Sequence, residues 1–76
     1  MILHKVRIVA YEKNSTGRYQ PFTKQGIIDL SRIEYMESDH IAQLGDCVIV
    51  RLATGKELTV MGKLTELYDA MGGKST

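Results

Sequence analysis

The sequence lacks the features of disulfide-stapled and membrane-spanning proteins. It contains one cysteine, Cys47, so no disulfide can form within the chain. No apolar run approaches the roughly 20 residues that a membrane-spanning helix requires. Lys5 and Arg7 interrupt the apolar start, which therefore does not resemble a signal peptide. We expect a cytoplasmic protein that keeps Cys47 reduced, packed as a small apolar side chain.

The 76 residues also lack a recognisable catalytic or cofactor-binding motif. The terminal GGKST ends like a phosphate-binding loop, but no first glycine and no following helix accompany it. We interpret residues 72–76 as a frayed tail. The sequence therefore predicts a protein that is not an enzyme, uses no cofactor and has no evident small-molecule substrate.

The densest group of titratable side chains is EYMESDH, residues 34–40. A metal site there would need Glu37, Asp39, His40 and Asp46 to converge, but their spacing matches no metal-binding motif. On a strand beginning at Ile33, alternation places Ile33, Tyr35 and Glu37 on one face and Glu34 and Met36 on the other, with Asp39 and His40 in the next loop. We interpret the stretch as a solvated strand end without a metal.

Periodicity predicts strands in most of the chain. Residues 2–11 alternate in polarity and are rich in β-branched side chains, as expected for a strand with one buried face. Residues 12–26 contain several turn residues and are predicted to be a flexible connection or, alternatively, a hairpin with arms at 10–13 and 18–23. The alternating pattern changes parity between Leu30 and Ile33, which predicts a helical turn or bulge at residues 30–32.

Residues 47–60 predict a second hairpin. A three-residue loop with Gly55 in the left-handed conformation would pair Val50 with Leu58 and Val48 with Val60, whereas a two-residue turn would split the apolar face. Leu64, Leu67, Tyr68 and Met71 then form one helical stripe, with Gly72 and Gly73 as the C-cap. We expect one α+β domain over residues 1–76, best defined over 27–71: a small antiparallel sheet of about four strands with one C-terminal helix packed on it.

The segments DLSRIEYMES, LATGKELTV and KLTELYDAM follow one another in an order that resembles the first half of LytTR-type DNA-binding domains. It also resembles the small FlbD-type flagellar regulatory proteins, which are similar in length. The basic half that contacts DNA in LytTR domains has no counterpart here, so no residue inherits that role. The resemblance implies a bacterial or phage half-module that completes its sheet by pairing with another copy.

Two functional surfaces are predicted. Residues 1–32 carry six basic and two acidic side chains, whereas residues 33–76 carry four basic and seven acidic ones. The leading hypothesis is a regulatory or protein-interaction module that forms a homodimer or binds another protein. Its binding surface would combine the strand face that carries Cys47, Ile49 and Arg51 with the basic first strand. The alternative is nucleic-acid binding through the basic first half. The residues assigned to that alternative are Lys5, Arg7, Arg18, Lys24 and Arg32.

Overall fold

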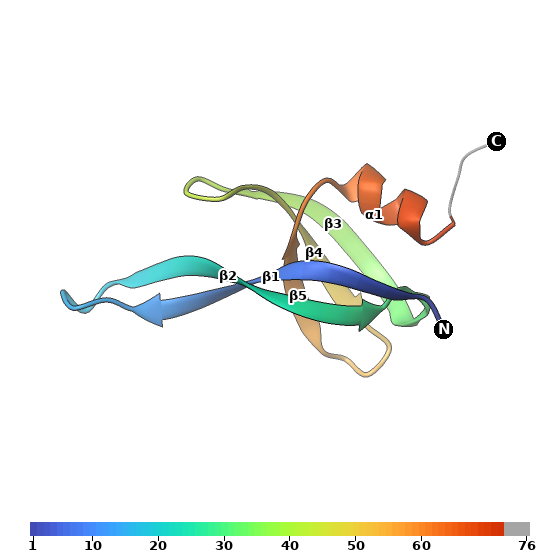
Figure 1. Cartoon of the computed structure of the whole chain (residues 1–76), viewed down its shortest axis with the longest axis horizontal. Helices are drawn as coiled ribbons and strands as arrows, with labels where there is room; N and C mark the ends of the chain where they lie inside the picture. Colours follow the sequence, from blue (N-terminus) through green and yellow to red (C-terminus); the bar gives the residue numbers. More distant parts are fainter. Residues whose placement is uncertain (73–76) are drawn as a thin grey trace.

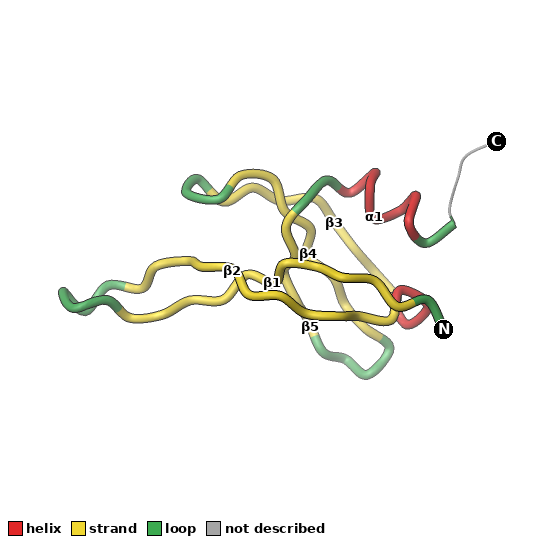
Figure 2. Tube along the Cα trace, viewed as in Figure 1, coloured by secondary structure: helices red, strands yellow, loops and turns green. Residues whose placement is uncertain are grey.

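The computed structural model describes residues 1–72, which fold as a five-stranded antiparallel sheet followed by a short helix (Figures 1 and 2). The elements in chain order are β1 (Leu3–Lys13), β2 (Tyr19–Asp29), the 3₁₀ turn η1 (Leu30–Arg32), β3 (Ile33–Ile41), β4 (Gly45–Leu52), β5 (Glu57–Met61) and α1 (Leu64–Ala70). The strand order in the sheet is β2-β1-β5-β4-β3. The α+β class with an antiparallel sheet and a C-terminal helix is confirmed, with five strands where about four were expected. Within residues 1–72, no helix is long and apolar enough to cross a membrane.

The additional strand is β2, which forms a long hairpin with β1 (Figure 1). The two strands pair over eleven residues each, from Leu3 opposite Asp29 to Lys13 opposite Tyr19. The flexible connection expected over residues 12–26 is therefore mostly strand, and the hairpin alternative is the arrangement found, with longer arms. A tight turn makes this possible: Gly17 has φ +84°, and the Asn14 side chain accepts hydrogen bonds from the turn residues that follow it.

The far half of this hairpin projects beyond the rest of the molecule, at the left of Figure 1. Strand β1 also pairs with β5, but within residues 1–72 the one pair assigned between them is Ile8 with Val60. We call residues 9–23 the arm; none of them is buried. The arm is therefore a two-stranded ribbon that contributes little to the core.

The core lies between the near half of the hairpin, the β3–β5 sheet and the helix. Because side chains alternate along a strand, Val6, Ile8 and Ile28 face inward from the hairpin. The buried cluster is apolar throughout and consists of Ile28, Leu30, Val48, Val50, Val60 and Leu67. Leu67 anchors α1 there, as its helical stripe predicted, and Gly72 ends the helix region with φ +82°. Gly73 and the rest of the expected tail lie outside the described residues.

The β4–β5 hairpin has the predicted register. Val50 lies opposite Leu58 and Val48 opposite Val60. The Leu52 backbone N–H donates to the Lys56 carbonyl at 2.8 Å, and Gly55 has φ +89°. These features confirm the three-residue loop, because the left-handed glycine allows the chain to return with all apolar pairs on one face.

The helical turn predicted at residues 30–32, where the alternation of apolar and polar residues changes parity, is also confirmed. Residues Leu30–Arg32 form the 3₁₀ turn η1, with Asp29 as its N-cap. The Asp29 carboxylate accepts hydrogen bonds from the Ser31 hydroxyl at 2.6 Å and from the Ile2 backbone N–H at 3.0 Å. The Ser31 hydroxyl, and after it the Ile2 N–H, lower the pKa of Asp29 from 3.8 to about 2. This carboxylate therefore ties the start of the chain to the end of β2.

Strand β3 differs from the prediction in two ways. The register shifts between Ile33 and Tyr35, so Ile33 packs against the core with Met36 while Tyr35 remains 49% exposed. The expectation that Ile33 and Tyr35 share a face is wrong, because a bulge at this point adds one residue to the strand. The strand also continues to Ile41, opposite Gly45, so the loop expected around Asp39 and His40 is strand as well.

Candidate interaction surface

The face predicted to bind a partner, formed by Cys47, Ile49 and Arg51, is only partly available. Cys47 is 1% exposed, Ile49 is half-buried and Arg51 is exposed. The Arg51 guanidinium lies 5.6 Å from the centroid of the Tyr35 ring and 3.4 Å from the Glu57 carboxylate. Cys47 therefore offers no contact surface, and Arg51 already has neighbours within the chain.

Burial also determines the chemistry of Cys47. Desolvation of the thiol, followed by the negative charges of Asp39 and Asp46, raises the pKa of Cys47 above its ordinary value. A thiol held in its protonated form is a weak nucleophile and a poor metal ligand. The buried position fits the expected role of a small apolar side chain.

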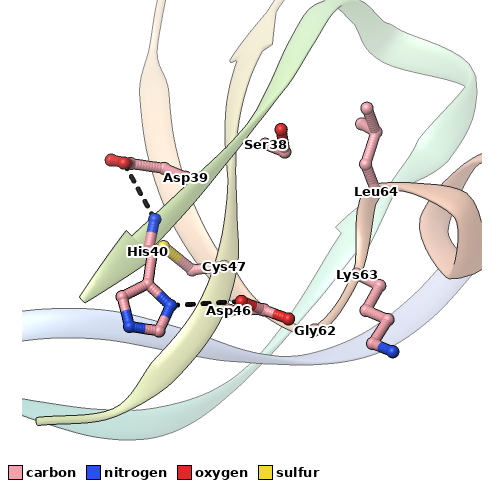
Figure 3. Close-up of a pocket in the computed structure, with 8 residues that line it drawn as sticks. All are labelled: Ser38, Asp39, His40, Asp46, Cys47, Gly62, Lys63 and Leu64. Atoms are coloured by element: carbon pink, nitrogen blue, oxygen red, sulfur yellow. Dashed lines mark hydrogen bonds and ion pairs between the residues drawn. The ribbon is translucent and has the colours of Figure 1, made fainter. Parts of the chain in front are cut away.

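The acidic stretch borders a hollow of about 410 Å³ beside the start of α1 (Figure 3). The His40 ring lies 3.1 Å from the Asp46 carboxylate, and the His40 backbone N–H donates to the Asp39 carboxylate at 2.8 Å. Both partners of the His40–Asp46 pair are well exposed, so the pair contributes little to stability. Among residues 1–72, no three His, Cys, Asp or Glu side chains are arranged to hold a metal ion.

The basic residues of the first half do not form one patch. Lys5 and Arg7 share the face of the β1–β2 hairpin that points away from the core, whereas Lys24 pairs with Ile8 and belongs to the opposite face. Arg18 follows the turn at the tip of the arm. Arg32 lies at the other end of β2, where its guanidinium is 3.4 Å from the Asp29 carboxylate. The five residues are therefore spread over both faces and both ends of the hairpin.

The hairpin instead exposes a surface that the sequence did not reveal. We call the side of β1 and β2 that points away from the core the hairpin outer face. Cross-strand partners share a face, so it combines Leu3, Lys5, Arg7, Val9, Tyr11 and Lys13 with Tyr19, Pro21, Thr23, Gln25, Ile27 and Asp29. Four large apolar or aromatic side chains on it are 58–69% exposed: Leu3, Tyr11, Tyr19 and Ile27.

These residues could have been found from one signal in the sequence. Asn14 and Gly17 have the same spacing as Leu52 and Gly55, and the two turns make the same pair of backbone hydrogen bonds. Reading Gly17 as a left-handed turn residue would have fixed the β1–β2 register and hence the outer face. Gly26 and Pro21 concealed the strand, because both residues are usually depleted in strands.

Comparison with known proteins assigns no family. The sequence matches no protein-family model, and no curated protein or solved structure is similar to it at a significant level.

Proposed function

We propose that this chain is a non-enzymatic protein-interaction or regulatory module that binds through its β1–β2 hairpin, either to a second copy or to another protein, in the cytoplasm. The observation that supports the proposal is the hairpin outer face. Leu3 and Ile27 are 61% and 64% exposed there, although the molecule has few buried side chains to stabilise it. Covering such side chains is a common way for a small domain to gain stability.

The proposal is tested by removing this apolar surface without disturbing the core. In the double variant Leu3→Ser with Ile27→Ser, we expect weaker self-association in multi-angle light scattering and weaker recovery of a protein partner in an affinity pull-down. Tyr68→Ser is the matched control, because Tyr68 is also exposed but lies on α1. A wild-type chain that is monomeric at every concentration and recovers no protein contradicts the proposal.

Nucleic-acid binding is the second candidate, and one observation favours it. Lys5, Arg7 and Lys13 share the hairpin outer face with Tyr11 and Tyr19. Cationic side chains interleaved with aromatic rings are typical of surfaces that bind single-stranded nucleic acids. Fluorescence anisotropy with labelled single-stranded DNA and RNA tests this candidate: binding should weaken steeply as salt increases, because phosphate contacts release counterions. Absence of binding at low salt rejects it.

A further inference from the structure

The outer edge of β2 is available for pairing with another strand. In residues 1–72, β2 has β1 as its only neighbour in the sheet. The Asn14 N–H donates to the Arg18 carbonyl and the Leu30 N–H donates to the Ile2 carbonyl, both at 2.8 Å. Because bonded and non-bonded pairs alternate in an antiparallel ladder, the even-numbered residues of β2 bond to β1. The backbone groups of Thr23, Gln25 and Ile27 therefore point away from the sheet.

This edge has little of the protection that natural sheets usually place on free edges. Charged side chains and prolines normally block such edges. The other free strand, β3, has them in Glu34, Glu37 and Asp39. Within residues 23–27 of β2 the charged side chain is that of Lys24, whose backbone groups bond to β1, and Pro21 lies nearer the tip of the arm. The outward backbone groups of Thr23, Gln25 and Ile27 therefore remain open to a pairing strand.

Hollows lie beside this open stretch on both faces of the hairpin. One, of about 260 Å³, opens toward the core and is mostly aliphatic, with a cationic rim. It is lined by Ile8, Ile28, Leu52, Leu58, Arg32 and Lys56, together with Ile27 and Asp29. The second, of about 390 Å³, is lined by Lys5, Gln25, Gly26 and Ile27. A strand added to β2 would direct alternate side chains toward these two hollows.

The charge around this edge is positive. Lys24 lies within residues 23–27, and Lys5, Arg7 and Lys56 line hollows beside them. None of these four side chains forms an ion pair within residues 1–72. Among residues 1–72, the carboxylate that lines these hollows is that of Asp29, and it already interacts with Ser31, Ile2 and Arg32. An acidic partner would therefore meet uncompensated positive charge.

From the free edge, the hollows and the charge together, we propose that β2 binds an extended acidic segment of another protein, which adds to the sheet as a sixth strand. The inference rests on the proposed function and specifies its partner. Backbone hydrogen bonds to Thr23, Gln25 and Ile27 supply the register. Aliphatic side chains of the segment enter the core-facing hollow, and its carboxylates lie near Lys5 and Arg7.

The probe is a short synthetic peptide that alternates valine and glutamate. Titration is followed by amide NMR and hydrogen exchange on the full chain. We expect the Thr23, Gln25 and Ile27 amides to shift and to exchange more slowly in the complex, while the β3 edge amides do not change. Two peptides serve as controls. The same peptide with N-methyl groups on alternate residues keeps its charge but cannot form backbone hydrogen bonds with β2, and a valine–lysine peptide has the opposite charge. Neither should protect the Thr23, Gln25 and Ile27 amides.

Two kinds of variant test the edge and the charge separately. Gln25→Pro removes an outward N–H without removing a bond to β1, and Pro21 shows that β2 accepts proline at an outward position. It should abolish protection by the peptide. Arg7→Glu should weaken binding about tenfold or more, as expected when an attractive charge contact becomes repulsive. Lys13→Glu is the matched control, with the same charge change on the same face but outside the hollows, and it should bind nearly as tightly as wild type.

The possible outcomes separate this inference from the broader proposal. Peptide binding that Gln25→Pro abolishes supports both. If light scattering shows a dimer in which these amides are already protected without peptide, a second copy occupies the β2 edge. That result overturns the proposal of an acidic partner segment but supports the proposal of an interaction module. If the chain stays monomeric, recovers no protein and leaves these amides unprotected with every peptide, both proposals are rejected.

Discussion

Gly55 and Gly17 offer a matched test of how the molecule divides its stability between the core and the arm. Both glycines have φ between +84° and +89°, and both close a three-residue loop with the same two backbone hydrogen bonds. Gly55 lies in the loop that joins β4 to β5, which carry the buried Val48 and Val60, whereas Gly17 lies in the turn at the tip of the arm. The same substitution at the two sites therefore imposes a similar local strain on two different parts of the fold.

The loss of stability expected on replacing Gly55 follows from its backbone conformation. No atom lies within 4 Å of a Cβ placed on Gly55, so a side chain there meets no steric clash and the cost arises from the positive φ. An L-residue in the left-handed region costs about 1–2 kcal/mol. Part of this is offset by about 0.4–1 kcal/mol, because the unfolded chain also loses freedom when glycine is replaced. We expect Gly55→Ala to lower the free energy of unfolding by about 1 kcal/mol and Gly55→Val by about 2 kcal/mol.

For a domain of this size, 1 kcal/mol corresponds to a change in Tm of about 4–8 °C. Thermal and urea unfolding followed by circular dichroism should show this loss for Gly55→Ala and a larger one for Gly55→Val. Gly55→Asn should stay close to wild type, because asparagine tolerates the left-handed region. The corresponding Gly17 variants should change Tm much less but increase amide exchange in the arm. Equal losses at both sites would refute the separation of arm and core, and a Gly55→Val variant as stable as Gly55→Asn would refute the strain argument.

Three further outcomes are expected. Leu30→Ala should lower the free energy of unfolding in urea by about 2–5 kcal/mol, because Leu30 is fully buried; a loss below about 1 kcal/mol would contradict its place in the core. Ionised Asp29 should stabilise the fold fully above about pH 4, and this stabilisation should fall as the pH drops toward 2, because folding lowers the pKa of Asp29 from 3.8 to about 2. Melting curves for Asp29→Asn should show lower stability at pH 7 and a flatter pH dependence between about pH 4 and pH 2. Identical pH profiles for the variant and the wild type would contradict this role of Asp29. Cys47 should react with a thiol-alkylating reagent far more slowly in the native protein than in urea, and equal rates would show that the thiol is accessible.

The parts of the fold that were predictable depend on local signals. Gly55 and the apolar side chains around it fix the β4–β5 register, because only one turn geometry keeps Val48 and Val50 on the same face as their partners. The break at Leu30 is likewise visible as a change of parity, and Leu67 lies at the centre of a helical stripe. In each case the residues that carry the signal lie within a few positions of one another.

The parts that were not predictable depend on contacts between distant residues. Strand β2 contains Pro21 and Gly26, and it is stabilised by pairing with β1 along its whole length rather than by its own propensity. The bulge before Tyr35 has no sequence signature, since nothing local requires an extra residue there. The burial of Cys47 depends on the surrounding fold, so strand parity alone could not show that its side chain is covered within the chain. The division of the basic residues between two faces was hidden for the same reason, because only the hairpin register separates Lys24 from Lys5 and Arg7.

The projecting arm also determines how the molecule moves through solution. The chain measures 49 × 24 × 18 Å and has a radius of gyration of 13.4 Å, whereas a compact chain of this length has a value of about 11 Å. An elongated particle experiences more friction than a sphere of equal mass, so the monomer should sediment slowly and elute early from a sizing column. Its retention volume will resemble that of a larger globular protein even without association. The same anisotropy makes the rotational correlation time a direct measure of the arm, because shortening the hairpin should accelerate tumbling more than the lost mass alone would predict.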